Sequence, residues 1–151
     1  MTESPFALAR RLRAGETVYG AWCMLGSSHV AETIAREGFA AVVLDAQHGL
    51  WDTGSLITGV GALNHAGSAP ALRVPLNDFA LVSRALDFGA EAIIAPMINT
   101  ADDARQFAAA AKYRRWGSAA GVPCAPWRCK APAQPPLIIC VRQMKARSPS
   151  R

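Results

Sequence analysis

Four short apolar runs, each followed by a segment of helical period, constrain this sequence more than any other feature. The runs predict strands at Thr17–Leu25, Ala40–Leu44, Ala71–Val74 and Ala92–Ala95. The second run shows no polar alternation, so both faces of its strand must be covered, which is typical of parallel sheets. Strands that alternate with helices in this way predict a parallel sheet with helices packed on it.

Helix signals flank each of these strands. A leading helix is expected over Ser4–Ala14, with Ser4 as its cap and Pro5 in its first turn. Four more helices are expected over Ser28–Glu37, from Asp52 or Thr53 to about His65, from Asn77 or Asp78 to Phe88, and after Thr100. Glycine, which commonly ends helices, follows three of them at Gly38, Gly67 and Gly89. The pattern gives four successive βα units after a leading helix.

Two architectures fit such units, a doubly wound sheet and a (β/α)8 barrel. No G-x-G-x-x-G follows the first strand, and Gly59-x-Gly61 lies within a helical pattern, so dinucleotide binding is only weakly indicated. Polar residues follow several strands, where barrel enzymes place their active sites: Gly26-Ser27-Ser28, Asp45-x-Gln47-His48, Arg73 and Asn99. Four units are half of a barrel, since a complete one takes about 250 residues.

The chain changes character at Tyr113. Residues 1–113 carry eight Lys/Arg and eleven acids, whereas residues 114–151 carry eight Lys/Arg and no acid. Six of the ten prolines and three of the four cysteines also lie in the second segment, where periodicity stops apart from a short apolar run at Leu137–Val141. We therefore expect a partial domain at 1–113 and an irregular, disordered tail at 114–151.

Several classes of protein are disfavoured by composition. No apolar run approaches the ~20 residues of a membrane span, and the N-terminus lacks the order of a signal peptide, so we expect a cytoplasmic protein without a membrane partner. Cys124, Cys129 and Cys140 lack paired C-x-x-C spacing, which argues against a zinc site. Cys23, within an apolar run, is expected in the core.

The stretch V-V-L-D-A-Q-H-G-L-W-D at residues 42–52 stands out within the domain. An apolar run ends in Asp45, and Gln47 and His48 follow almost at once. Histidine titrates near neutral pH and is a common general base, although a histidine after a strand is more often a simple loop residue. The stretch is thus either a polar strand end or the lip of an active site, and Asp45 is either a supporting or a merely structural residue.

Four motifs in order carry a family resemblance: G-A-W at 20–22, D-x-Q-H-G at 45–49, R-V-P at 73–75 and L-D-F-G-A at 86–90. Over residues 5–113 the chain resembles the HpcH/HpaI aldolases, pyruvate-dependent class II aldolases that include the 2,4-dihydroxyhept-2-ene-1,7-dioate aldolases. The resemblance implies an α/β fold, the N-terminal half of a (β/α)8 barrel. It also implies a metal-dependent carbon–carbon lyase that uses the pyruvate enolate as donor and an aldehyde or 2-keto-hydroxy acid as partner.

The resemblance implies a role for each of five residues. His48 is expected to act as the base at the pyruvate methyl group through a metal-bound water, with Asp87 orienting its imidazole. Arg73 is expected to contact a pyruvate oxygen and stabilise the enolate, and Gln47 and Trp22 to contact substrate. Relatives of this kind use Mg²⁺ or Mn²⁺ and assemble as homo-oligomers.

The sequence departs from the family pattern after Tyr113. The family's metal ligands are a Glu and an Asp from later strands, and no acid follows Asp103 here. We therefore expect this chain alone to bind no metal and to be inactive, with its first and fourth strands as open edges. If the reading frame of the coding DNA shifts by one nucleotide after Tyr113, allowed codons can encode the continuation of the sequence found in the family. The tail is therefore interpreted as out of frame.

Two alternatives remain. One is a citrate-lyase-like or malyl-CoA-lyase-like cleavage on a similar half-barrel, although D-A-Q-H-G favours the aldolases. The other is a non-catalytic fragment whose basic tail binds nucleic acid in a salt-dependent way. No nucleic-acid fold motif accompanies the basic residues, so no nucleic-acid partner is expected.

Overall fold

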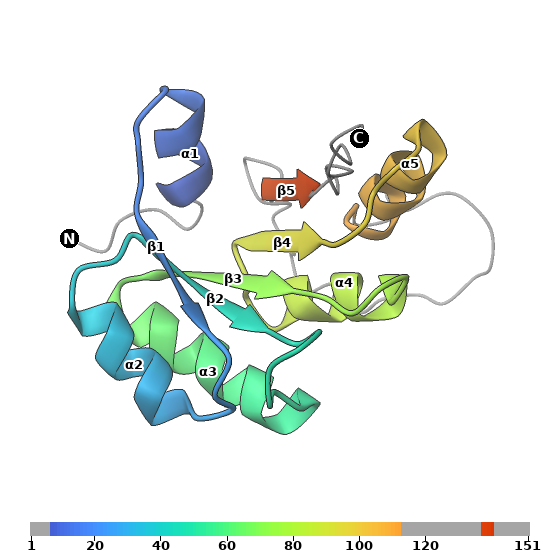
Figure 1. Cartoon of the computed structure of the whole chain (residues 1–151). Helices are drawn as coiled ribbons and strands as arrows, with labels where there is room; N and C mark the ends of the chain where they lie inside the picture. Colours follow the sequence, from blue (N-terminus) through green and yellow to red (C-terminus); the bar gives the residue numbers. More distant parts are fainter. Residues whose placement is uncertain (1–6, 113–136, 141–151) are drawn as a thin grey trace, which may run out of the picture.

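The computed structural model describes residues 7–112 and the backbone of 137–140. Five helices and five strands alternate along these residues (Figure 1). The helices are α1 (Ala7–Arg13), α2 (Ser28–Arg36), α3 (Thr53–Ala66), α4 (Phe79–Asp87) and α5 (Ala101–Ala110). The strands are β1 (Gly20–Cys23), β2 (Ala41–Asp45), β3 (Ala69–Arg73), β4 (Ala92–Ala95) and β5 (Leu137–Cys140).

The strands form one parallel sheet in the order β1-β2-β3-β4-β5. This confirms the α/β class and the succession of βα units. The order follows the chain, as in a barrel wall, without the reversal of strand order that defines a doubly wound sheet. No helix of the described residues is long and apolar enough to cross a membrane.

The strand β5 corrects one expectation. We predicted no regular structure after Tyr113, yet Leu137–Cys140 pairs in parallel with β4 over its whole length. The edge of β4 exposes unpaired backbone groups, and a short apolar run satisfies them. The prediction that the fourth strand is an open edge is therefore wrong. The other residues of the predicted tail, 113–136 and 141–151, lie outside the described residues.

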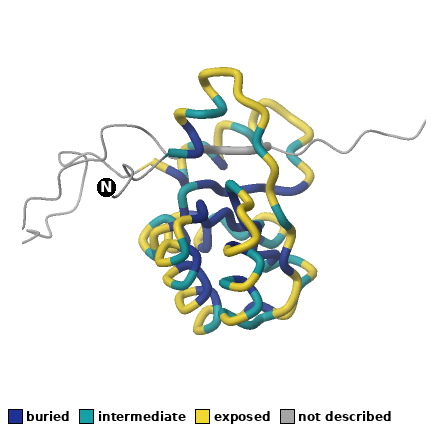
Figure 2. Tube along the Cα trace, turned by 90° about the vertical axis from the view of Figure 1, so that its left-hand side faces the viewer, coloured by how far each residue is buried: buried dark blue, intermediate teal, exposed yellow. Residues whose placement is uncertain are grey.

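The sheet buries two different faces. The face against α2, α3 and α4 carries mostly large aliphatic side chains, including Leu44, Leu72 and Ile93, all fully buried. The opposite face packs against Leu8 of α1 and is built mainly from small residues: Ala41, Val43, Ala69, Ala71, Ala92 and Ile94. Figure 2 shows the buried residues concentrated along the strands and on the sides of the helices that face them. The small-residue face leaves room above the sheet for bulky polar side chains.

Local chemistry sets most of the element ends. The Asp52 side chain accepts from Ser55 N at 2.7 Å, and Thr100 caps α5 in the same reciprocal way with Asp103. β3 begins at Ala69, two residues earlier than the predicted start at Ala71. The Pro70 carbonyl accepts from Glu91 N at 2.8 Å, and Ala69 N donates to Ala40 O, so the segment is bonded on both sides.

Candidate active site

The candidate site lies at the carboxyl ends of β1, β2 and β3, on the small-residue face of the sheet. Asp45 ends β2 and Arg73 ends β3, and the two are register partners. Trp22 is the register partner of Val43, which lies two residues before Asp45. Because side chains alternate between faces along a strand, this register brings Trp22, Asp45 and Arg73 together on one face.

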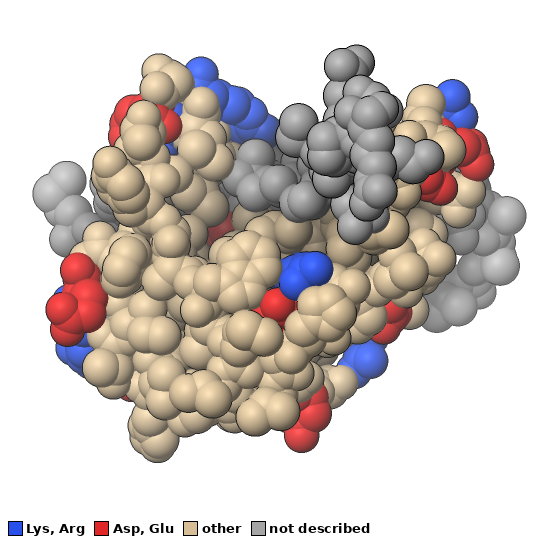
Figure 3. Space-filling model, in the orientation of Figure 1, with Lys and Arg blue, Asp and Glu red and all other residues tan. Residues whose placement is uncertain are grey.

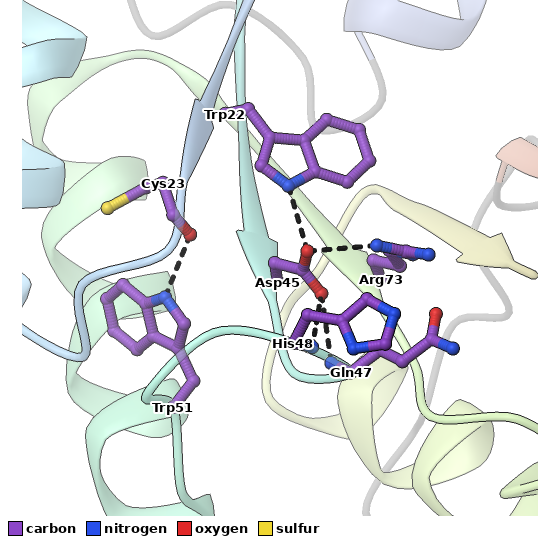
Figure 4. Close-up of polar contacts among 7 residues, drawn as sticks. All are labelled: Trp22, Cys23, Asp45, Gln47, His48, Trp51 and Arg73. Carbon is purple, nitrogen blue, oxygen red and sulfur yellow. Dashed lines mark hydrogen bonds and ion pairs between the residues drawn. The ribbon is translucent and has the colours of Figure 1, made fainter.

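Asp45 is the centre of the cluster (Figure 4). Its Oδ2 accepts from Trp22 Nε1 and from Arg73 Nη1, each at 3.0 Å. Its Oδ1 accepts from the backbone N–H groups of Gln47 at 2.9 Å and His48 at 3.1 Å. The residue is 1% exposed. Four donors on one buried carboxylate make it the fixed point around which the other side chains are arranged.

These contacts keep the carboxylate ionised. Burial raises the pKa of Asp45, but the hydrogen bonds from Trp22, the two backbone amides and Arg73 together outweigh it. The pKa therefore lies below its ordinary value of 3.8. At neutral pH the site holds a buried negative charge that is matched by the guanidinium of Arg73.

The turn after β2 presents His48. The Gly49 N–H donates to Asp45 O at 3.0 Å, and Leu50 N donates to Met24 O at 2.8 Å, so the turn is tied to both strand ends. A Cβ at position 49 would overlap Asp45 O and lie 2.8 Å from Met24 O, which explains the glycine. His48 is exposed, and its imidazole lies beside the Asp45–Arg73 pair (Figure 4). The turn thus holds the histidine backbone rigidly and leaves the ring accessible.

Within the described part of the chain, Arg73 has donors left for a ligand. Its guanidinium has five N–H groups, and Asp45 accepts from Nη1. It also lies over the Trp22 ring, 5.7 Å from the centroid, so the indole face restrains it. Figure 3 shows charged atoms of both signs side by side in the middle of a largely uncharged surface. This arrangement suits recognition of a small anion.

Gln47 and Trp22 differ in how far they are satisfied. Gln47 Oε1 is buried, and no hydrogen bond of the described residues reaches it. Trp22 is half exposed, with its N–H used by Asp45. A buried amide oxygen without a donor is costly, and such atoms often mark a place where a ligand or water binds. Trp51, by contrast, is buried and donates to Cys23 O at 3.0 Å, a packing role.

Asp87 does not join this cluster within one chain. It is the last residue of α4, which runs antiparallel to the strands and returns the chain to the amino end of β4. His48 follows the carboxyl end of β2, so a strand length of about 15 Å separates the two levels. The sequence motif could not reveal this, because it gives spacing along the chain and not the direction of the helix. The role of Asp87 as partner of His48 stays a prediction.

Among the residues the structure describes, no three His, Cys, Asp or Glu side chains gather as a metal-binding group. The Asp45 carboxylate already accepts from four donors. The described residues therefore do not fit the divalent metal that the resemblance implies.

The sequence motif alone leaves Asp45 open between a structural and a supporting role. The signal that identifies its role is the alternation of side chains between the two faces of a strand. Trp22, Asp45 and Arg73 each end or nearly end a strand, so aligning the strand ends places all three on one face.

Comparison with known proteins identifies the family of the chain. The family model described as HpcH/HpaI aldolase/citrate lyase matches residues 19–134. The chain belongs to this family. The match covers all of β1 to α5 and extends beyond Tyr113.

Individual members of the HpcH/HpaI family are similar in sequence to the same part of this chain. The chain is 33% identical over 104 residues to a hydroxypyruvate/pyruvate aldolase of Roseobacter denitrificans, covering 69% of this chain and 41% of the relative. It is 33% identical over 102 residues to a 4-hydroxy-2-oxo-heptane-1,7-dioate aldolase of Salmonella arizonae, covering 68% and 39%. The chain thus spans about two fifths of the length of these relatives.

A solved structure of the HpcH/HpaI family superposes on the same region. The family protein from Burkholderia cenocepacia aligns with a TM-score of 0.67 and 35% identity, over 71% of this chain and 43% of that one. The fold is therefore that of the amino-terminal part of this family.

Proposed function

We propose that this chain carries the keto-acid-binding part of a carbon–carbon lyase that uses pyruvate as the enolate donor. The observation that carries the proposal is the Asp45–Arg73 pair, held in register and flanked by Trp22 and His48. The aldolase relatives named above support the class of reaction.

Arg73 is proposed to bind the oxygens of the keto acid. Its side chain is 22% exposed, so one side of the guanidinium is open while the other is fixed by Asp45. A fixed cation stabilises the oxyanion that develops when a proton leaves the methyl group, because no reorganisation is needed at that moment. Asp45 acts through Arg73 as a positioning residue.

His48 is proposed to move that proton. A general base must lie within reach of the carbon that loses the proton. The exposed imidazole of His48 lies beside Arg73, the proposed ligand of the keto acid, and so meets this requirement (Figure 4). Gln47 Oε1, buried and without a donor, is proposed to accept a hydrogen bond from a ligand hydroxyl or a water. In the wider family a bound Mg²⁺ or Mn²⁺ would supply Lewis-acid chemistry.

Turnover by this chain alone is expected to be negligible, because the described residues provide no acidic ligand set. The measurement is product formation from pyruvate and an aldehyde with and without Mn²⁺. Robust metal-dependent turnover would contradict this expectation. It would leave the proposed role of Arg73 intact.

Binding tests the role of Arg73 directly. Pyruvate titrated calorimetrically into the chain should bind at least about tenfold more weakly to Arg73→Met, because a charge-assisted hydrogen bond is lost. Arg84→Met is the matched control, since Arg84 is exposed on α4 and stacks on Phe88. Equal affinities in both variants would refute the proposed site.

We also propose that residues 114–151 are read out of frame. The motivating observation is the loss of every acid after Asp103, together with the change in proline and cysteine content at Tyr113. Sequencing the coding DNA decides it. An intact frame with no family motif in the alternative frame would end the idea.

A further inference from the structure

Exposed apolar side chains are concentrated at the edge of the sheet that carries the candidate site. Nine large apolar side chains of the described residues are exposed. Six of them lie at the carboxyl end of a strand or in the loop that follows it: Trp22, Met24, Leu25, Leu50, Leu76 and Met97. Tyr19 and Phe39 precede β1 and β2, and Ile57 lies on α3. Exposed apolar residues that gather on one surface commonly mark a binding site.

The loops after β1 and β2 fix the position of Leu50. Leu50 N donates to Met24 O at 2.8 Å, and a Cβ at position 26 would overlap Leu50 O, so the two loops are in backbone contact. The Leu50 side chain is nevertheless 77% exposed. His48 lies two residues earlier in the same turn. The turn that presents the proposed base thus also holds a large apolar side chain in contact with solvent.

The loops after β3 and β4 do the same with Leu76 and Met97. Leu76 follows Arg73 by three residues, and it is 51% exposed. Met97 is 39% exposed and has a φ of 58°, a conformation that a methionine rarely adopts. Asn99 Nδ2 donates to Met97 O at 3.0 Å and braces this backbone. β3 and β4 are neighbours in the sheet, so both side chains belong to the same part of the edge.

Charge at this edge is confined largely to the Asp45–Arg73 pair. The described loops at 24–27, 46–52, 74–78 and 96–100 contain neither lysine nor arginine. Their two acids, Asp52 and Asp78, each accept from a backbone N–H at the start of a helix. Figure 3 shows the charged pair within a largely uncharged surface. Within these loops a ligand with one carboxylate finds its cation in Arg73, whereas a second carboxylate would be desolvated against apolar side chains without a partner.

We propose that the site selects 2-keto acids that carry a single carboxylate and an uncharged, apolar chain. The proposal rests on the proposed role of Arg73 in binding the keto acid. The Trp22 ring, half exposed and 5.7 Å from the guanidinium, begins the apolar surface directly beside that cation. The chain that extends from the methyl carbon of pyruvate lies on this surface, and its carbons leave water. Because the aldehyde partner joins at that carbon, the partner is an apolar aldehyde.

Matched keto acids separate the effect of an apolar chain from the effect of a second charge. 2-Oxohexanoate extends pyruvate by a propyl group, and 2-oxoadipate has a carboxylate in place of the terminal methyl group of 2-oxohexanoate. Titrated calorimetrically into the 151-residue chain, 2-oxohexanoate should bind at least about tenfold more tightly than pyruvate. 2-Oxoadipate should bind no more tightly than pyruvate, because its second carboxylate lies among apolar side chains.

Two variants test whether the named side chains carry the preference. In Leu50→Asn and in Leu76→Asn, the ratio of the affinities for 2-oxohexanoate and pyruvate should fall by about threefold or more, because less apolar surface is covered. Tyr19→Asn is the matched control, since Tyr19 is as exposed as Leu50, at 77%, but precedes the amino end of β1. Its ratio should equal that of the native chain. Circular dichroism checks that each variant folds.

Four results overturn the proposal. They are 2-oxohexanoate that binds no more tightly than pyruvate, 2-oxoadipate that binds as tightly as 2-oxohexanoate, a ratio unchanged in both leucine variants, and an equal fall in Tyr19→Asn. When pyruvate binds and Arg73→Met weakens its binding, each of these results removes the apolar preference and leaves the role of Arg73 intact. A chain that binds none of the three keto acids removes both the role of Arg73 and the preference that rests on it.

Discussion

The loops at both ends of the sheet contain residues with positive φ, but the residue types differ between the two ends. At the amino end, the turns before β2, β3 and β4 use a glycine with positive φ: Gly38 at 90°, Gly67 at 80° and Gly89 at 100°. At the carboxyl end, the loops after β3 and β4 place non-glycine residues there, Asn77 at 60° and Met97 at 58°. Glycine adopts this conformation freely, whereas an asparagine and especially a methionine do so at a cost.

This difference in residue type distinguishes turns with a structural role from loops that carry the candidate site. The amino-end turns are short and relaxed, and they serve only to return the chain to the sheet. The carboxyl-end loops hold strained backbone, a buried ion pair and the orphan oxygen of Gln47. Strain and buried polar groups persist where the surrounding structure enforces them, and such places are often functional. If the carboxyl end is the more constrained of the two, substitutions there should lower stability more than substitutions at the amino end.

The largest effect is expected at Gly49. Gly49→Ala should lower the free energy of unfolding by about 3 kcal/mol or more, because the new methyl group meets two backbone oxygens that cannot move independently. Gly38→Ala at the amino end should cost about 1 to 2 kcal/mol, since its Cβ meets no atom within 4 Å and only the φ is unfavourable. Urea unfolding measures both. Equal losses would remove the distinction between the two ends.

The next effect is expected at Asp45. Asp45→Asn should lower the free energy of unfolding by about 2 to 3 kcal/mol, because Arg73 loses its partner in a largely buried place. Asp102→Asn, which breaks the exposed pair with Arg105, should have almost no effect. Chemical denaturation compares the two variants. A similar change in both would mean that the buried pair contributes no more than a surface one.

Acid should weaken the carboxyl end specifically. The pKa of Asp45 is lowered in the folded protein, so the unfolded chain takes up its proton first as the pH falls. The contribution of Asp45 is therefore complete above about pH 4 and is lost as the pH falls through the folded-state pKa. The urea midpoint of the native chain minus that of Asp45→Asn should shrink over this range. A difference that is constant down to strongly acidic pH would contradict the assignment.

The smallest change in stability is expected at Gln47. Gln47→Met removes a buried oxygen without a donor and keeps the length of the side chain. The free energy of unfolding should stay the same or rise by up to about 1 kcal/mol, because an unsatisfied acceptor is removed. Affinity for pyruvate should stay unchanged, because pyruvate has no hydroxyl that could donate to Gln47 Oε1. Thermal unfolding and calorimetry measure the two quantities, and a loss of stability would show that Gln47 is a structural residue.

Much of the fold could be predicted from local signals. The caps Asp52 and Thr100 and the continuous apolar run of β2 each fix an element by short-range chemistry, and the structure places elements there. β5 was missed because its only support is long-range, since Leu137–Cys140 becomes a strand by pairing with β4. Pairing across more than forty residues leaves no mark in local periodicity.

The site was predictable to a different extent. Motifs predict Trp22, Gln47, His48 and Arg73, and the structure gathers them around the carboxyl ends of β1, β2 and β3 and the turn after β2. The central place of Asp45 depends on register, which a motif does not contain. The separation of Asp87 depends on the direction of α4, which spacing along the chain does not contain either.

The most direct test of the account follows the indole N–H of Trp22 by nuclear magnetic resonance while pyruvate is added. Trp22 donates to Asp45 within the candidate site, whereas Trp51 donates to Cys23 O in the core and serves as an internal control. The signal absent from Trp22→Phe identifies the resonance. We predict a saturable shift of the Trp22 signal, no shift of the Trp51 signal, and loss of the response in Arg73→Met. A Trp22 signal that does not move at saturating pyruvate, or one that moves equally in Arg73→Met, would contradict it.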